Sequence, residues 1–365
     1  MNSNSKKYIS KWGAGMLAAG ILLGGTGIIH AGITEAAPAA AQVKAKSSSV
    51  VLKVNGKSTA QTGLLQEGKV WVPVTFLRDA LGMPLSYDKA GKTYTIGTGT
   101  AQTRLTINDY GISVMVNNYY VGEGKQLNNR LYVSSELLSD YLGYKVDGGA
   151  AAGRLNVMKK VQNAVTIKTV SYVKDHKDAP IRLDYPQVSG LASAEAEKAI
   201  NDTIKQTVLN YAKDAEDQIS KRSKDDRPYE FEGGYVVTYN QDGVLSLITN
   251  QYGYTGGAHG MTYRNAFTFS LKDGKRLLLG DLFGANPNYK KQLNAKLATE
   301  IKANGGYLGG FNGLNTEKYF YLKDGKAVLF FQLYEYTAYA EGFPEFNFSF
   351  KELLPDGSSP FAALK

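Results

Sequence analysis

The segment whose residues could most readily carry chemistry is a glycine-rich run that leads to a histidine, Tyr252 to Gly260. Paired glycines followed by a histidine can bring backbone N–H groups close to an anionic ligand or an oxyanion. The alternative is a tight turn between two strands, with the histidine hydrogen-bonded as a structural buttress. We favour the turn, because no serine in a nucleophile-elbow pattern and no partner histidine accompanies the run. Its candidate ligand-binding residues are Tyr254, Gly256, Gly257 and His259.

A second segment, Tyr334 to Phe346, is dense in aromatic rings and carboxylates. Aromatic faces beside carboxylate acceptors suit a sugar ring or a cationic protein surface. Two of the acids, Glu335 and Glu341, could also act as the acid and base of a glycosidase, but the sequence leaves their separation open. The competing interpretation is core packing of the aromatic rings, with the acids exposed. The candidate ligand-binding residues are Tyr334, Glu335, Tyr336, Tyr339, Glu341, Phe343 and Glu345.

The composition excludes several kinds of chemistry. The chain has no cysteine in 365 residues, which rules out disulfides, thiolate metal sites and a cysteine nucleophile. It has three histidines, and His30 falls in the N-terminal segment described next, so a three-histidine copper site cannot be assembled from the rest. We therefore expect no cofactor, no metal ion, no complete catalytic set and no nucleic-acid partner.

The N-terminus has the order of a secretory signal. Lys6, Lys7 and Lys11 precede an uncharged stretch of 17 residues, Gly13 to Ile29, and small residues follow up to Ala41. The stretch is at the lower limit for crossing a bilayer, so an uncleaved membrane anchor is the alternative to cleavage. We expect residues 1–41 to be a signal peptide or an anchor, residues 42–49 to be a linker, and the protein to be extracellular or at the cell surface.

The positive charge is concentrated in one part of the chain. Residues 42–164 hold 15 Lys and Arg against 8 Asp and Glu, whereas residues 165–365 hold 24 of each. A basic extracellular domain suits an anionic wall polymer or membrane surface. Solubility alone is an equally good explanation, because no run of five or six like charges occurs.

A repeat of about 61 residues fills the region 50–160. Val54-Asn55-Gly56 returns as Val116-Asn117-Asn118, and Ala80-Leu81-Gly82 has its counterpart in Tyr141-Leu142-Gly143. Each half predicts a hairpin, a strand, a short helix ending at glycine and another strand. This unit resembles the copper amine oxidase-like N-terminal domain, or stalk domain, of secreted bacterial surface proteins. The resemblance concerns the fold, since the histidines that the oxidase chemistry needs are missing.

From Val165 the pattern changes to longer elements, and we expect an α+β region with an antiparallel sheet and two main helices. The first helix is predicted over Ser193 to Ser220, with Ser193 as the N-cap and acids in the first turn. The second is predicted at about Tyr289 to Ala303. The expected domain limits are 50–160 for the stalk, 165–262 and 263–352 for two α+β domains packed on each other, and 353–365 for a tail.

Residues from about Val170 to Phe350 resemble the paired domains of unknown function in the extracellular parts of PdaC-type peptidoglycan deacetylases and RsiV-type anti-sigma factors. The resemblance implies peptidoglycan association in the first relative and lysozyme binding in the second. The His-x-x-x-His zinc motif of the deacetylases is absent from this sequence, and we expect the 12 residues before Gly13 to be too few for a sigma-binding segment. The residues that carry the resemblance are Gly256-Gly257-Ala258-His259, Asp281-Leu282-Phe283, Phe320-Tyr321-Leu322, Tyr334-Glu335 and Gly342-Phe343-Pro344-Glu345-Phe346.

Taken together, these patterns favour a non-enzymatic cell-envelope protein whose basic stalk contacts wall polymer or peptidoglycan. One alternative is a binder, sensor or inhibitor of a secreted muramidase such as lysozyme, motivated by the acids among the aromatics. The other is a wall-directed hydrolase, which requires His259 to converge with Glu335 or Glu341. Contact with a membrane is expected only through the N-terminal segment, if that segment is not cleaved.

Overall fold

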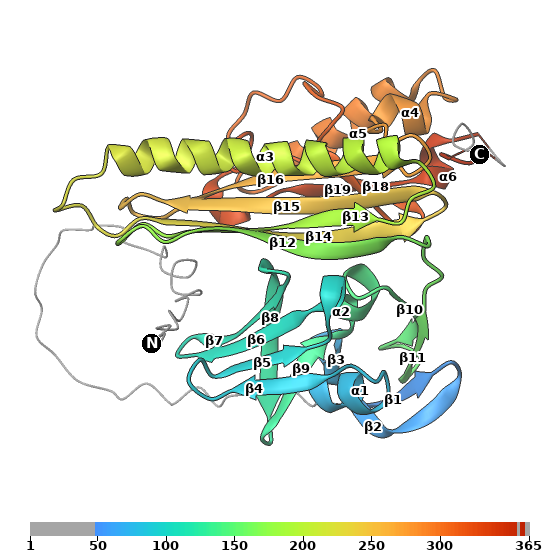
Figure 1. Cartoon of the computed structure of the whole chain (residues 1–365). Coiled ribbons are helices and arrows are strands. Elements are labelled where there is room, and N and C mark those ends of the chain that lie inside the picture. The colour runs from blue at the N-terminus through green and yellow to red at the C-terminus, as the bar shows by residue number, and fades with distance from the viewer. Residues whose placement is uncertain (1–47, 356–357, 362–365) are drawn as a thin grey trace, which may run out of the picture.

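A computed structural model of the chain describes residues 48–355 and 358–361. The predicted signal or anchor, 1–41, and most of the predicted linker lie outside the described residues. Within the described part, no helix is both long and apolar enough to cross a membrane. The architecture is α+β, as predicted, with a mostly-β stalk followed by an α+β region (Figure 1).

The strands of the stalk form one hydrogen-bonded sheet, in the order β10-β11-β1-β2-β3-β9-β8-β7-β6-β5-β4. Two short helices lie at equivalent places in its two halves (Figure 1). The elements are β1 (Ser48–Val54), β2 (Lys57–Gln66), β3 (Lys69–Pro73), α1 (Val74–Asp79), β4 (Leu85–Asp88), β5 (Thr93–Ile96), β6 (Thr103–Asn108), β7 (Gly111–Val116), β8 (Tyr119–Leu127), β9 (Arg130–Ser134), α2 (Ser135–Asp140), β10 (Tyr144–Gly149) and β11 (Arg154–Lys159).

The predicted repeat is confirmed by how the two halves pair. β3 and β9 run antiparallel with Val72 opposite Val133. These residues are equivalent in the repeat, so the pair marks a local twofold relation between the halves. The hairpin turns repeat as well: Asn55 and Gly56 have φ of 50° and 81°, and Asn117 and Asn118 have φ of 46° and 62°. Positive φ at both central residues is the turn geometry that suits a two-residue hairpin.

The α+β region begins with a five-stranded sheet in the order β12-β13-β14-β15-β16. The helix α3 lies along one face of this sheet (Figure 1). β13 and β14 are parallel because α3 carries the chain back along the sheet, whereas the other neighbouring strands are antiparallel as predicted. The elements are β12 (Thr166–Lys174), β13 (Ile181–Ser189), α3 (Ala194–Ser220), β14 (Glu230–Gln241), β15 (Val244–Tyr254) and β16 (Met261–Ser270).

The helix α3 begins where the sequence predicts. The hydroxyl oxygen of Ser193 accepts a hydrogen bond from the backbone N–H of Ala196 at 3.0 Å, which satisfies one of the free donors of the first turn. Its buried stripe includes Ile200, Ile204 and Val208, spaced at four residues, and packs on the sheet.

A three-stranded sheet, β17-β18-β19, completes the region and packs on the second main helix, α5. β16 pairs with β15 along its length, so the five-stranded sheet continues to Ser270, and the expected domain limit near residue 262 stays a prediction. The elements are α4 (Leu279–Phe283), α5 (Tyr289–Lys302), β17 (Phe320–Lys323), β18 (Lys326–Phe330), β19 (Glu345–Ser349) and α6 (Phe350–Leu353).

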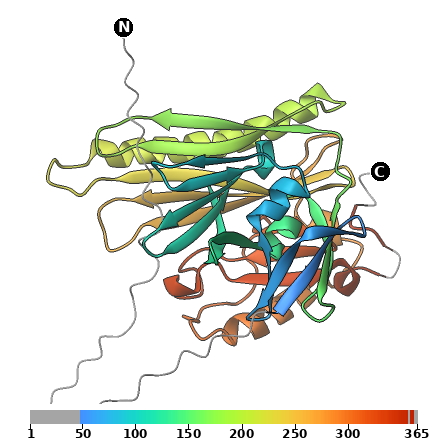
Figure 2. The same ribbon diagram turned by 90° about the horizontal axis from the view of Figure 1, so that it is seen from below.

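The central strands of the five-stranded sheet are buried on both faces. Side chains alternate along a strand, and directly opposed residues point to the same face. Phe231 and Phe267 therefore face α3. The opposed row Val236, Ile248 and Ala266 faces away from α3 and belongs to the same hydrophobic core as the stalk. Figure 2 shows the stalk lying across that face.

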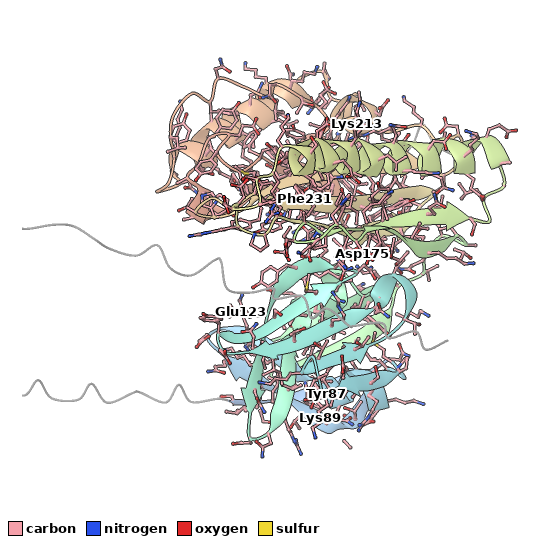
Figure 3. The ribbon with its side chains drawn as sticks, turned by 60° about the vertical axis from the view of Figure 1, so that its left-hand side comes forward. Tyr87, Lys89, Glu123, Asp175, Lys213 and Phe231 are labelled. Carbon is pink, nitrogen blue, oxygen red and sulfur yellow. The ribbon has the colours of Figure 1, made fainter. Side chains whose placement is uncertain are left out.

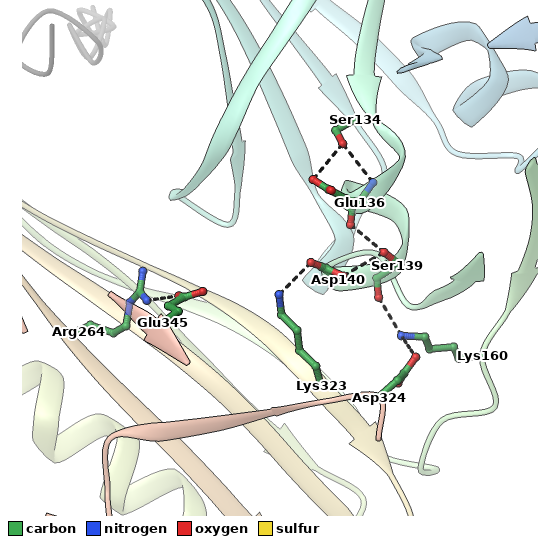
Figure 4. A network of polar contacts seen from close by, with 9 residues as sticks. All are labelled: Ser134, Glu136, Ser139, Asp140, Lys160, Arg264, Lys323, Asp324 and Glu345. Atoms are coloured by element: carbon green, nitrogen blue, oxygen red, sulfur yellow. Dashed lines mark hydrogen bonds and ion pairs between the residues drawn. The ribbon is translucent and has the colours of Figure 1, made fainter. Parts of the chain in front are cut away.

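Polar contacts fix the stalk in place around this shared core. The backbone N–H of Tyr235 donates to the carbonyl oxygen of Asn117 at 3.2 Å, so the β7–β8 turn is bonded directly to β14. Two ion pairs lie at the other side of the junction, Lys323 with Asp140 and Lys160 with Asp324, each at 2.9 Å (Figure 4). The stalk and the α+β region therefore pack as one body.

A substitution at Gly234 tests the packing of the stalk on the sheet. A Cβ atom at Gly234 would meet the backbone carbonyl group of Asn118 and would lie 2.5 Å from the backbone nitrogen of Tyr119. Gly234→Ala should therefore force the stalk off the sheet and lower the free energy of unfolding by about 1–3 kcal/mol, the usual cost of overpacking. Urea unfolding measures this change. Gly305→Ala, where no atom lies within 4 Å of the new Cβ, is the control, and equal unfolding curves for the two variants would contradict the prediction.

Candidate functional site

The structure brings the ends of the two candidate segments together. The imidazole of His259 stacks on the ring of Tyr339 with centroids 4.1 Å apart, and Tyr334 lies 5.5 Å from Tyr339. The Nε2 atom of His259 is 3.2 Å from the hydroxyl oxygen of Tyr334, and its Nδ1 atom is 2.9 Å from the carbonyl oxygen of Gly260. We call His259, Tyr334 and Tyr339 the aromatic cluster. It presents stacked rings with polar edges at the surface.

Tyr334 is held in an unusual backbone conformation. Its φ is +62°, in the left-handed region that bulky residues rarely adopt. Its side chain is nevertheless 46% exposed, so burial does not explain the conformation. The neighbouring Gln332 fixes the loop, because its side-chain amide bonds both the N–H and the carbonyl oxygen of Arg264, at 3.1 and 2.7 Å. In this conformation the Tyr334 hydroxyl oxygen lies 3.2 Å from Nε2 of His259.

The glycine-rich turn differs from the favoured interpretation in one respect. His259 is hydrogen-bonded, as expected of a buttress, but it is exposed and thus open to a ligand. Gly256 has a φ of +88°, whereas Gly257 lies outside the left-handed region. The hydroxyl of Tyr254 donates to the carbonyl oxygen of Gly257 at 3.1 Å and closes the turn.

The three acids of the second segment have separate partners. Glu335 accepts from the side-chain amide of Asn315 at 3.1 Å, and Glu341 accepts from that of Asn304 at 3.2 Å. Glu345 forms an ion pair with Arg264 at 2.5 Å. Within residues 48–355 and 358–361, no hydrogen bond is found between His259 and any of these carboxylates.

Two further candidates have other surroundings. The ring of Tyr336 packs edge-on against Phe331, with centroids 4.8 Å apart, and is partly buried against the hydrophobic core under α5. The ring of Phe343 covers the guanidinium of Arg264 at 4.0 Å. No group of three or more metal-ligating side chains is found in the described part of the chain.

A cleft of about 170 Å³ opens beside the aromatic cluster, where the stalk, the sheet and the C-terminal loops meet. We call it the junction cleft. The stalk contributes Asn118 and Tyr120, and the loops contribute Tyr339 and Phe343. Its floor is two rows of opposed residues on the sheet face that turns away from α3. The rows are Glu232, Tyr252 and Thr262, and Gly234, Asn250 and Arg264.

Arg264, in the second row of the floor, is the one guanidinium among the described residues that line the cleft. It is 8% exposed, and its charge is balanced by the ion pair with Glu345 (Figure 4). Its Nε atom donates to the side-chain oxygen of Asn250 at 3.3 Å. A buried charge needs such partners, so Arg264 stabilises the floor of the cleft and adds no net charge to it.

Glu232 faces the cleft from the first row of the floor. Burial, together with repulsion and a hydrogen bond from the nearby Glu230, raises the pKa of its carboxyl group to about 9. Two cations, Arg104 of the stalk and Arg182 of β13, act in the opposite direction. At neutral pH the Glu232 carboxyl group therefore keeps its proton, and it can both donate and accept a hydrogen bond.

The sequence analysis missed the residues of the cleft that come from the stalk and the sheet. They are scattered from Asn118 to Arg264, and only the docking of the stalk brings them together. Two local signals were present: the Gly233-Gly234 pair inside a long strand, which marks a close backbone approach, and Arg264, the one charged residue of the strand Met261–Ser270.

Three family models match successive parts of the chain, as the sequence resemblances predicted. The copper amine oxidase N-terminal domain matches residues 42–157, Deacetylase PdaC matches residues 173–262, and the protein of unknown function DUF3298 matches residues 280–351. Among curated proteins, peptidoglycan-N-acetylmuramic acid deacetylase PdaC of Bacillus subtilis (strain 168) is 22% identical over 151 residues. That match covers 40% of this chain and 31% of the relative.

Two solved structures of the DUF3298 family are similar to the chain. The protein from Bacteroides fragilis is 19% identical, with 56% of this chain and 99% of that chain covered and a TM-score of 0.42. The protein from Pseudomonas aeruginosa PAO1 is 16% identical, with 53% and 98% covered and a TM-score of 0.39.

The turn gives a matched pair of variants. Gly256→Ala places a side chain on a residue at φ +88° and should lower the free energy of unfolding by about 1 kcal/mol. Gly257→Ala, at ordinary φ and with its nearest neighbour 3.8 Å from the new Cβ, should change it by less than about 0.5 kcal/mol. Thermal melts compare the two, and a larger loss for Gly257→Ala would contradict the structure.

Glu232 predicts a pH dependence of stability. An unfolded glutamate loses its proton near a pH of about 4.3, whereas folded Glu232 keeps it to about 9. The folded state binds the extra proton between these values, so its stabilising effect is complete below the unfolded pKa and is lost as the pH rises through the folded pKa. The glutamine of Glu232→Gln cannot ionise, so its stability does not depend on this proton. The unfolding free energy of the variant minus that of the wild type should therefore be larger at pH 8 than at pH 4.

Urea unfolding at the two pH values measures the effect. Glu123→Gln, at an exposed position of β8, controls for the loss of one negative charge from the chain. An equal gain for Glu232→Gln at pH 4 and pH 8 would show that the carboxyl group is ionised in the folded state.

Proposed function

We propose that the chain is a non-catalytic binding protein of the cell envelope, in which the aromatic cluster is a recognition surface and the basic stalk contacts wall polymer. The aromatic cluster carries the proposal. Three rings from two distant loops pack together, His259 and Tyr334 are exposed while Tyr339 is half-buried, and Tyr334 is held on a strained backbone. Strain kept at an exposed ring is typical of a binding or active site.

The similarity to a peptidoglycan deacetylase supports a place in the envelope. It matches a region of the relative that amounts to 31% of its length. Export by the N-terminal segment, extracellular or surface location and contact with peptidoglycan are parts of this proposal. The limits of 165–262 and 263–352 for the paired domains remain a prediction.

The surface of the stalk supports the electrostatic part. Lys89 lies at the end of the stalk far from the sheet, near Tyr87 (Figure 3). Several basic residues of the stalk are exposed and form no ion pair with another described residue, which leaves their charge available to an anionic polymer. They are Lys57, Lys69, Lys89, Lys92, Arg130, Arg154 and Lys159.

The two alternatives have less support. The acids that suggested a cationic muramidase as partner, Glu335, Glu341 and Glu345, are each bonded within the chain. A hydrolase needs an acid or base within hydrogen-bond reach of its partner, and His259 instead bonds Tyr334 and Gly260.

Co-sedimentation of the full-length chain with purified cell walls tests the proposal. We expect retention that decreases as salt is raised from about 50 to 500 mM, because the Debye length shortens. The double variant Lys89→Glu and Lys92→Glu should be retained less at low salt, whereas Lys213→Glu on α3 is a control for a change of charge outside the stalk. If retention changes neither with salt nor with the stalk double variant, the electrostatic part of the proposal is contradicted.

Tyr334→Asn tests the aromatic part in the same assay. Asparagine tolerates the left-handed region, so the unfolding free energy of the variant should stay within about 1 kcal/mol of the wild-type value. The variant should nevertheless bind walls more weakly. Tyr336→Ala is the contrast, because it removes a core ring and should cost about 2–4 kcal/mol of stability. Undiminished retention of Tyr334→Asn would count against the recognition surface.

A further inference from the structure

The junction cleft and the aromatic cluster form one continuous surface. Tyr339 belongs to both, since its ring stacks on His259 and also lines the cleft. Tyr252 of the floor packs directly on Gly260, where a Cβ atom would overlap its ring. A ligand lying across the cluster can therefore extend a part of itself into the cleft.

The cleft is electrically neutral. Arg264 is paired with Glu345, and Glu232 keeps its proton at neutral pH. The other polar groups that line it are uncharged amides and hydroxyls, such as Asn118, Asn250 and Thr262. An anionic group would find no unpaired cation in the lining, and an ionised ligand would lose hydration without compensation. The cleft therefore favours an uncharged ligand, in contrast to the basic stalk.

The lining combines aromatic rings with hydrogen-bonding groups. Tyr120 of the stalk and Phe343 of the C-terminal loop contribute rings, and so does Tyr252 of the floor. Asn118, Asn250 and Glu232 contribute amide and carboxyl groups to the same lining. A sugar ring has the matching pattern, with apolar C–H faces and a rim of hydroxyl groups. A volume of about 170 Å³ is small beside the ~300–1,000 Å³ of a drug-sized pocket, and it suits a single ring.

We propose that the junction cleft binds one uncharged sugar ring of a longer glycan, whose neighbouring units lie on the aromatic cluster. This inference deepens the proposed function, since it assigns a neutral glycan to the recognition surface and leaves anionic polymer to the stalk. It also makes the stalk part of the site. Asn118 is fixed from both domains, because it accepts from Arg104 of the stalk and donates to Asp184 of β13.

Titration calorimetry of the full-length chain at pH 7 tests the inference with three probes. Chitotriose and cellotriose are neutral and differ in their acetamido groups, so they distinguish an N-acetylated wall glycan from a plain hexose chain. Trigalacturonate has similar rings with carboxylates. We expect at least one neutral trisaccharide to bind, and trigalacturonate to bind at least tenfold more weakly.

Tyr120→Ala removes one wall of the cleft, at a residue that is 41% exposed, and should weaken the neutral trisaccharide by roughly three- to tenfold. Tyr110→Ala is the matched control, a tyrosine of the same domain that is 76% exposed and outside the cleft. Glu232→Gln should keep the affinity, since its amide also donates and accepts. Glu232→Lys should abolish binding, and a thermal melt shows whether that variant is folded.

The two proposals fail in different ways. If the wild-type protein is retained on cell walls but gives no heat with either neutral trisaccharide up to about 5 mM, the sugar site is overturned and the proposed function stands. If a trisaccharide binds but the protein is not retained on walls, the sugar site stands and the proposed wall binding is overturned. Equal affinities for Tyr120→Ala and Tyr110→Ala, or tighter binding of trigalacturonate, would also overturn the sugar site.

Discussion

Close packing of the stalk against the sheet at Gly234 is the contact on which the rest of the molecule depends. The β7–β8 turn lies so near to this residue that no side chain fits between them, and Tyr235 bonds the turn directly. Beyond it, Val236 and Ile248 complete one hydrophobic core with the stalk. Since hydrophobic burial stabilises roughly in proportion to area, a shared core makes the two regions one cooperative structure.

The two-sided burial of the five-stranded sheet follows from strand alternation. One set of side chains packs under α3, and the other set packs under the stalk and β17–β18. Toward the start of β14, the second set changes from apolar Val236 to Gly234 and then to Glu232. That gradient, from core to bare backbone to polar group, is what opens a cleft at the edge of the interface.

Arg264 connects this interface to the candidate site. It is buried between the sheet and the C-terminal loop, where Glu345 and Phe343 hold its guanidinium. Its own backbone is bonded by Gln332, two residues before the strained Tyr334. Packing at the domain junction thus also sets the position of the exposed rings, so binding and folding share the same contacts.

The sequence by itself determined the local structure. Hydrophobic periodicity and turn residues fixed the repeat, the N-cap at Ser193, both main helices and the α+β class, because these depend on neighbours within one or two turns. It also identified Tyr339, His259 and Tyr334 as candidates by residue type. Only the tertiary structure decided which of them meet, that Tyr336 joins the core, and that Asn118 and Glu232 face one cleft. The contacts of the aromatic cluster and of the cleft join residues far apart in the sequence, such as His259 and Tyr334 at 75 positions. Their geometry follows from how whole domains pack, which no short-range pattern contains.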